Sequence, residues 1–63
     1  MSTLHVVAST EILGLDSDVS LSSKASGNGE ISYTLASSNF DALRAIEVSL
    51  RANNSVVSIQ LSK

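Results

Sequence analysis

The chain has 63 residues, a formal net charge of −2 and no cysteine. A chain of this length forms one domain, residues 1–63, and lies near the lower size limit for folding without further support. Because the sequence lacks cysteine, disulfides and thiolate metal sites are excluded, and association with a second subunit remains as a means of stabilisation. We therefore expect a homodimer or a higher homo-oligomer.

The balance of four basic and six acidic residues weighs against a nucleic-acid-binding protein, which would show a basic face. The sequence contains no run of about 18 apolar residues, which a membrane-spanning helix needs, so we expect no membrane partner. It also begins without the basic region and apolar core of a signal peptide, and we therefore expect a cytoplasmic protein.

The first predicted element is a strand over residues 3–13, in which β-branched residues are common. One face of this strand would carry Leu4, Val6, Ala8, Thr10 and Ile12. The alternation weakens toward the end of the segment. A β-bulge, a division into two shorter strands and a short helical turn over residues 8–13 are the alternatives to one continuous strand.

A polar turn over residues 14–18 precedes two alternating segments, residues 19–24 and 31–36. The Gly-Asn-Gly sequence at positions 27–29 separates these segments, and such turns connect the strands of a β-hairpin. Alternate residues of the second strand should face the core, namely Ile31, Tyr33 and Leu35.

A helix is predicted over residues 40–52. Ser38 or Asn39 can accept hydrogen bonds from the first free backbone amides, and Asp41 lies in the first turn, where negative charge is favoured. At helical spacing, the face that should pack on the sheet consists of Leu43, Ile46 and Leu50.

The other side of this helix carries a second apolar strip of small residues, Ala45, Val48 and Ala52. A helix with its back to water normally carries a wide polar face, whereas the polar stripe here is narrow. That stripe consists of Arg44, Glu47 and Arg51. We predict that the apolar strip is an oligomer interface, and simple exposure of its three residues to water is the alternative.

The last predicted strand covers residues 56–62, after a helix exit at Asn53 or Asn54 in the left-handed conformation. Its core-facing residues should be Val57, Ile59 and Leu61. The order β-β-β-α-β predicts an α+β fold, a four-stranded mixed sheet with one helix packed on one face. The strands before and after the helix should be parallel, and the remaining pairs should be antiparallel hairpins.

The sheet face away from the helix should carry mainly hydroxyl and amide side chains: Ser20, Ser22, Ser32, Thr34, Ser58 and Gln60. Antiparallel sheets commonly have one face in water, so we expect this face to be solvated. Packing against the sheet of a second copy, or against a polar ligand, is the alternative.

Two short motifs resemble functional sites but lack required parts. The Gly-Asn-Gly sequence lacks the third glycine and the following helix of a dinucleotide-binding loop. Asp16, Ser17 and Asp18 resemble the start of a calcium-binding loop, but no glycine follows at the sixth position. We therefore predict no catalytic residue, no metal and no cofactor.

The sequence best supports a self-associating protein-interaction or accessory module without catalysis. The first alternative is a small-ligand site or minimal enzyme at a subunit interface, formed by His5, Glu11 and Tyr33, because histidine is the residue type best suited to general acid–base chemistry. The competing interpretation is that His5 is a strand histidine with local hydrogen-bond partners and that Tyr33 is an aromatic residue of the core. A weaker alternative is single-stranded nucleic-acid binding through the small mixed patch of Phe40, Arg44 and Arg51.

Overall fold

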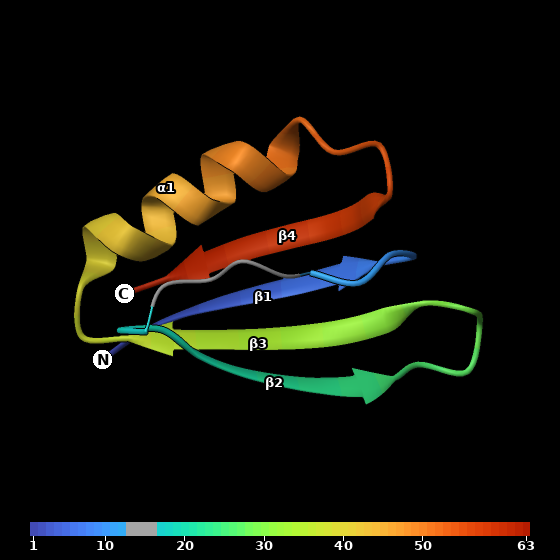
Figure 1. Cartoon of the computed structure of the whole chain (residues 1–63), viewed down its shortest axis with the longest axis horizontal. Helices are drawn as coiled ribbons and strands as arrows, with labels where there is room; N and C mark the ends of the chain where they lie inside the picture. Colours follow the sequence, from blue (N-terminus) through green and yellow to red (C-terminus); the bar gives the residue numbers. More distant parts are fainter. Residues whose placement is uncertain (13–16) are drawn as a thin grey trace.

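The computed structural model of the chain describes residues 1–12 and 17–63, which form a sheet of four strands and one helix (Figure 1). The elements are β1 (Ser2–Ala8), β2 (Ser20–Ala25), β3 (Ile31–Ser37), α1 (Phe40–Arg51) and β4 (Val56–Ser62). The predicted α+β class and the β-β-β-α-β order along the chain are confirmed.

The sheet has the strand order β2-β3-β1-β4, and every adjacent pair is antiparallel. The predicted mixed sheet is therefore wrong, and so is a hairpin between the first two strands. Because β1 is antiparallel to both β3 and β4, those two strands run in the same direction, as the connection through a helix requires. They are not neighbours, since β1 lies between them (Figure 1).

The strand order follows from composition. The inward side chains of β1 are completely buried, namely Leu4, Val6 and Ala8. All six residues of β2 are exposed, and serine and lysine dominate them. Polar and charged residues are typical of edge strands, where they discourage pairing with other chains. The apolar N-terminal strand therefore takes an inner position, and β2 takes one edge.

The first strand ends at Ala8, five residues before the predicted end at position 13. After it the chain leaves the sheet, and the phenol of Tyr33 pairs with the backbone there. The Tyr33 hydroxyl accepts a hydrogen bond from the Ile12 N–H and donates one to the Thr10 carbonyl, both at 3.3 Å. Ile12 and Val19 are buried in the core, so these two residues between β1 and β2 help to cover the sheet. Most of the predicted 14–18 turn lies outside the described residues.

The predicted hairpin between β2 and β3 is confirmed. Gly27 and Gly29 have positive φ angles of 88° and 77°, which side chains with a Cβ rarely adopt. Ser26 closes the loop, because both its backbone N–H and its hydroxyl donate to the Glu30 carbonyl.

Helix α1 begins where the sequence predicts. The Asn39 side chain accepts hydrogen bonds from the backbone amides of Asp41 and Ala42, at 3.1 and 3.4 Å. The helix ends at Arg51 with Ala52 as its right-handed C-cap. A left-handed exit at Asn53 or Asn54 is wrong, since no described non-glycine residue has positive φ. The Asn53 side chain instead accepts from the Ser55 N–H at 2.9 Å and so forms a local turn.

The helix packs on one face of the sheet and lies alongside β4 (Figure 1). Leu43 is fully buried, and three further apolar residues of the helix are partly buried against the same core: Ala42, Ile46 and Leu50. This confirms the predicted inward face of the helix and adds Ala42 to it.

A register shift in β4 changes which of its residues face the core. Ser58 pairs with Val7 and Val56 pairs with Ala8, so Val57 is the extra residue of a β-bulge. Val56 consequently packs against the core, whereas Val57 is 61% exposed. The predicted inward position of Val57 is wrong because strict alternation fails at the bulge, but Ile59 and Leu61 face inward as predicted.

Candidate functional site

The three residues of the predicted ligand site do not meet within one chain. His5 is exposed and pairs with Thr34 on the sheet face away from α1, where their side chains approach to 3.4 Å. Tyr33 points to the opposite face and is 3% exposed. Glu11 is exposed beyond the end of β1. A site at a subunit interface would involve a second chain, so that hypothesis stays a prediction.

Tyr33 has a structural explanation that does not involve a ligand. Its ring lies in the core, and its hydroxyl uses both its donor and its acceptor capacity on the backbone of residues 10–12. The phenol therefore holds the chain after β1 against the sheet.

The helix strip predicted as an oligomer interface is exposed along its whole length. Ala45, Val48 and Ala52 are all exposed, and Val48 retains 59% of its accessible surface. No other element of the described chain covers them. Below we call these three residues the outer strip.

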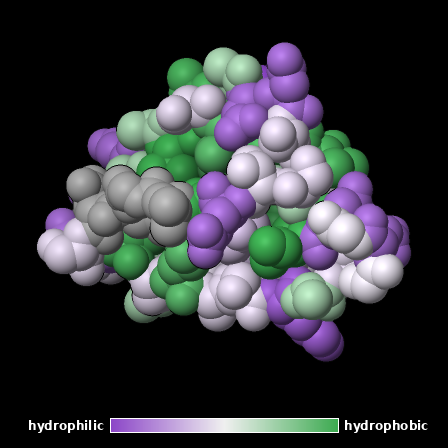
Figure 2. Space-filling view, turned by 45° about the vertical axis from the view of Figure 1, so that its right-hand side comes forward, coloured by the Kyte–Doolittle hydropathy of each residue, from purple (hydrophilic) through white to green (hydrophobic). Residues whose placement is uncertain are grey.

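Apolar side chains reach the surface in several separate places on the face shown in Figure 2, with polar side chains between them. The large apolar residues that are exposed in the described chain are Met1, Leu21, Val48 and Val57. Val48 is the one that belongs to α1, and it lies between two alanines of the outer strip at helical spacing.

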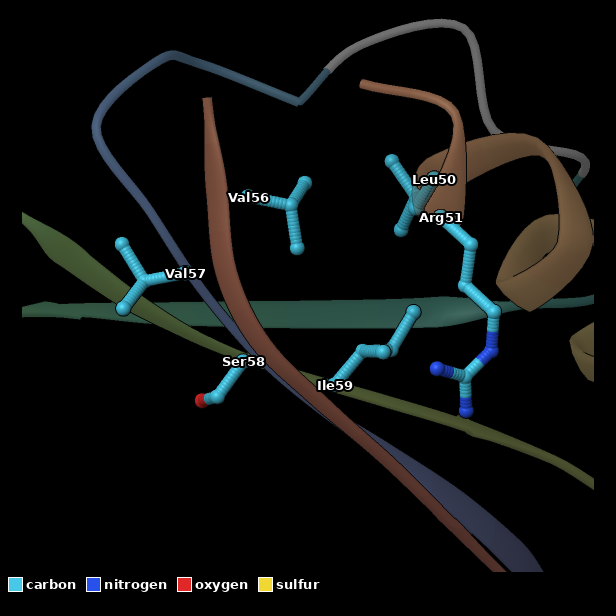
Figure 3. Close-up of a pocket in the computed structure, with 6 residues that line it drawn as sticks. All are labelled: Leu50, Arg51, Val56, Val57, Ser58 and Ile59. Carbon is cyan, nitrogen blue, oxygen red and sulfur yellow. The ribbon is translucent and has the colours of Figure 1, made fainter. Parts of the chain in front are cut away.

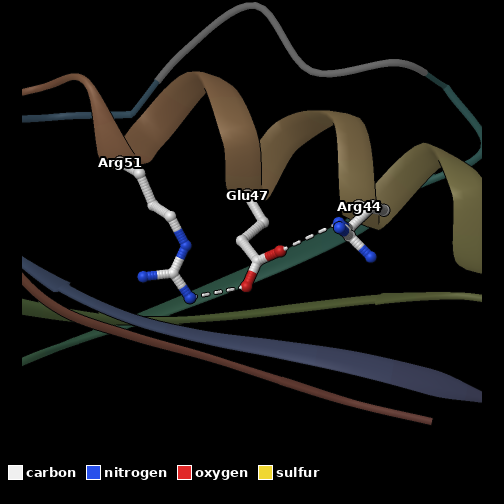
Figure 4. Close-up of polar contacts among 3 residues, drawn as sticks. All are labelled: Arg44, Glu47 and Arg51. Atoms are coloured by element: carbon white, nitrogen blue, oxygen red, sulfur yellow. Dashed lines mark hydrogen bonds and ion pairs between the residues drawn. The ribbon is translucent and has the colours of Figure 1, made fainter.

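The polar stripe of α1 forms a compact ion-pair network (Figure 4). Arg51 Nη2 lies 2.8 Å from Glu47 Oε2, and Arg44 Nε lies 3.4 Å from Glu47 Oε1. The Glu47 side chain is only 12% exposed, whereas the two arginine side chains are 63% and 57% exposed. One shielded carboxylate thus orients two guanidinium groups that stay largely in water.

A pocket of about 370 Å³ lies between the last turn of α1 and the first half of β4. Its lining consists of Leu50, Arg51, Val56, Val57, Ser58 and Ile59 (Figure 3). Leu50, Val56 and Ile59 give it an apolar wall, and the Arg51 side chain extends alongside Ile59. We call this feature the α1–β4 groove.

Sequence reasoning missed this groove. Its lining combines the end of the helix with a bulged strand, and the bulge that orients Val56 and Val57 gives no sequence signal here. Positions 50–51 belong to the predicted helix and positions 56–59 to the predicted last strand. These positions come together because α1 packs alongside β4.

Lys63 extends the positive charge along the same side of the molecule. It follows β4, and its Nζ lies 4.9 Å from the centroid of the Phe40 ring at the start of α1. At this distance a cation–π interaction is expected. The ring of Phe40 is therefore already in contact with a side chain of the same domain.

The described residues, 1–12 and 17–63, contain no cluster of three or more His, Cys, Asp and Glu side chains that could hold a metal ion. The segment that resembles the start of a calcium-binding loop, Asp16-Ser17-Asp18, lies partly outside these residues because Asp16 is not among them. Helix α1 has 12 residues, and no helix in the described part of the chain is long and apolar enough to cross a membrane.

Comparison with protein-family models, with curated proteins and with solved structures gives no match to this chain.

Proposed function

We propose that this chain is a protein-interaction module without catalytic activity, which associates with a second copy of itself through the outer strip of α1. The observation that supports the proposal is the exposure of Val48, at 59%, between Ala45 and Ala52. These residues follow the spacing i, i+3 and i+7, which is the spacing along the seam of two packed helices.

The small side chains of the outer strip suit contact between the α1 helices of two copies. Alanine at two of the three positions lets two helix backbones approach closely, and the valine supplies apolar surface to bury. The core-facing side of α1 is engaged by its own sheet through Leu43, so the outer strip is free for a second copy.

The need for association follows from the size of the domain. All residues of β2 are exposed. Few side chains of the domain are fully buried, and the largest of them are Leu4, Val6, Leu35 and Leu43. Small domains without disulfides often gain stability from a partner subunit. A cysteine-free chain has no need of an oxidising compartment, and we place the module in the cytoplasm as an accessory or regulatory subunit.

A dilution series followed by ¹⁵N–¹H correlation spectra tests the proposal. When the protein is diluted from a concentration at which it associates, the amide signals of Ala45, Val48 and Ala52 should shift together. The signals of the β2–β3 hairpin should not shift. Val48→Glu should give the dilute spectrum at all concentrations, because it places a charge in the seam. Ser22→Glu adds the same charge at an exposed position of β2, which does not contact α1, and should show the same dependence on concentration as the unaltered chain.

The proposal fails if the spectra do not depend on concentration, or if Ser22→Glu and Val48→Glu have the same effect. In the first case no association occurs, and in the second any added charge on the chain, rather than a charge in the outer strip, explains the change.

A further inference from the structure

The sheet has two edges with different surroundings. Both β2 and β4 pair with a single neighbour, so each has one row of backbone N–H and C=O groups without a strand partner in the described residues. Such an edge can accept a further strand from another chain. β2 has no wall beside it, since all its residues are exposed, whereas α1 lies alongside β4.

The α1–β4 groove provides a place for an apolar side chain next to the β4 edge. Leu50 from the helix and Val56 and Ile59 from the strand form its apolar wall (Figure 3). A strand added to β4 would direct every second side chain to this side of the sheet. One of these side chains could therefore enter the groove while the backbone pairs with β4.

The charge of the groove side is opposite to that of the whole chain. Three of the four basic residues lie along α1 and β4 on this side, namely Arg44, Arg51 and Lys63. Glu47 is the acidic residue among them, which gives a formal charge of +3 − 1 = +2, whereas the whole chain has −2. The remainder of the chain therefore carries −2 − 2 = −4.

We propose that the α1–β4 groove binds an acidic peptide segment in extended conformation, which adds to the sheet as a strand next to β4. One apolar side chain of this segment occupies the wall of Leu50, Val56 and Ile59, and flanking carboxylates pair with the guanidinium groups of Arg51 and Arg44. The site lies on a different side of α1 from the outer strip, so this inference does not depend on self-association.

A peptide suits the groove better than a single-stranded nucleic acid. Nucleic-acid recognition of this kind depends on aromatic rings on which bases stack. Phe40 is the aromatic residue on this side, and the Lys63 ammonium group already lies over its ring. An unpaired strand edge beside an apolar wall, by contrast, is what peptide recognition by strand addition uses.

The test uses a terminally blocked peptide, Thr-Glu-Thr-Val-Thr-Glu-Thr. As a strand it presents the valine and both glutamates on one face, and its symmetric sequence gives the same pattern in either direction. Titrated into ¹⁵N-labelled protein, it should shift the amide signals of β4 and of the last turn of α1 in a saturable manner. The second edge, β2, is the internal control, and its signals should not shift.

Peptide and protein variants separate the contributions. Replacing both glutamates by lysine should weaken binding about fivefold, because two exposed charge pairs are lost and each contributes a modest amount. Arg51→Glu should weaken binding of the original peptide by about the same factor, and Arg44→Glu provides a second charge reversal in the same network. Lys24→Glu changes the net charge equally but lies on β2, so it should leave the affinity unchanged.

Three results would overturn the inference. They are the absence of saturable shifts on β4, equal shifts on β2 and β4, and equal weakening by Lys24→Glu and Arg51→Glu. A deca-deoxythymidine that binds the same amides more tightly than the peptide would also overturn it, and would assign the groove to nucleic acid.

Discussion

The phenol oxygen of Tyr33 accepts a hydrogen bond from the backbone N–H of Ile12 at 3.3 Å, across 21 positions of sequence. The same hydroxyl donates to the Thr10 carbonyl. Tyr33 thus connects the middle of β3 to the chain segment that follows β1, and it replaces the backbone pairing that the segment loses on leaving the sheet.

Removing this hydroxyl should destabilise the domain. In Tyr33→Phe the ring remains in the core, but the Ile12 N–H and the Thr10 carbonyl lose their partner. We expect the free energy of unfolding to fall by about 1–3 kcal/mol, the usual cost of leaving buried polar groups unpaired. Urea unfolding followed by circular dichroism measures it. Thr34→Val, on the outer face of the same strand, is the control and should change stability by no more than about 0.5 kcal/mol.

The helix start depends on one side chain. Asn39→Ala removes the acceptor for the amides of Asp41 and Ala42 and should cost about 1 kcal/mol of stability. Asn39→Asp keeps an acceptor and should be close to neutral. Ser38→Ala should also be close to neutral, since Ser38 is exposed and does not cap α1. Thermal unfolding measures the loss of stability. A larger loss for Ser38→Ala than for Asn39→Ala would show that Asn39 is not the residue that caps the helix.

The two sides of α1 should respond differently to truncation. Leu43 is fully buried, so Leu43→Ala should cost about 2–5 kcal/mol and could unfold so small a domain at room temperature. Ser49 is exposed on the same helix, and Ser49→Ala should be neutral or slightly stabilising because alanine favours the helix. Circular dichroism of both variants at one protein concentration makes the comparison. Similar stability of the two would show that Leu43 does not anchor the helix.

The bulge in β4 reverses the expected roles of two adjacent valines. Val56→Thr places a hydroxyl against the core and should destabilise by about 1–3 kcal/mol. Val57→Thr changes a residue that is 61% exposed and should stay within about 0.5 kcal/mol. Urea unfolding measures both losses. A larger loss for Val57→Thr than for Val56→Thr would indicate strict alternation along β4 and would contradict the bulge.

Local structure was largely predictable from the sequence because single residues determine it. Gly27 and Gly29 supply the positive φ angles of the hairpin, and Asn39 supplies the helix cap. The spacing of Leu43, Ile46 and Leu50 identified the core-facing side of α1. These signals act over a few positions and depend little on the rest of the fold.

The arrangement of the strands was not predictable in the same way. The crossover rule gives the relative direction of β3 and β4, but it does not say whether another strand lies between them. The insertion of β1 depends on the burial of Leu4 and Val6 relative to the polar β2, which is a comparison over the whole chain. The α1–β4 groove depends on this arrangement and on the bulge at Val57, so it could not be predicted before either was known.

Association through the outer strip of α1 is tested most directly by sedimentation equilibrium at several loading concentrations in the tens-of-micromolar range. The mass of one chain is 6.6 kDa. We predict a mass of twice this value for the unaltered chain and a single-chain mass for Val48→Glu. A single-chain mass for the unaltered protein at every concentration would contradict the proposal.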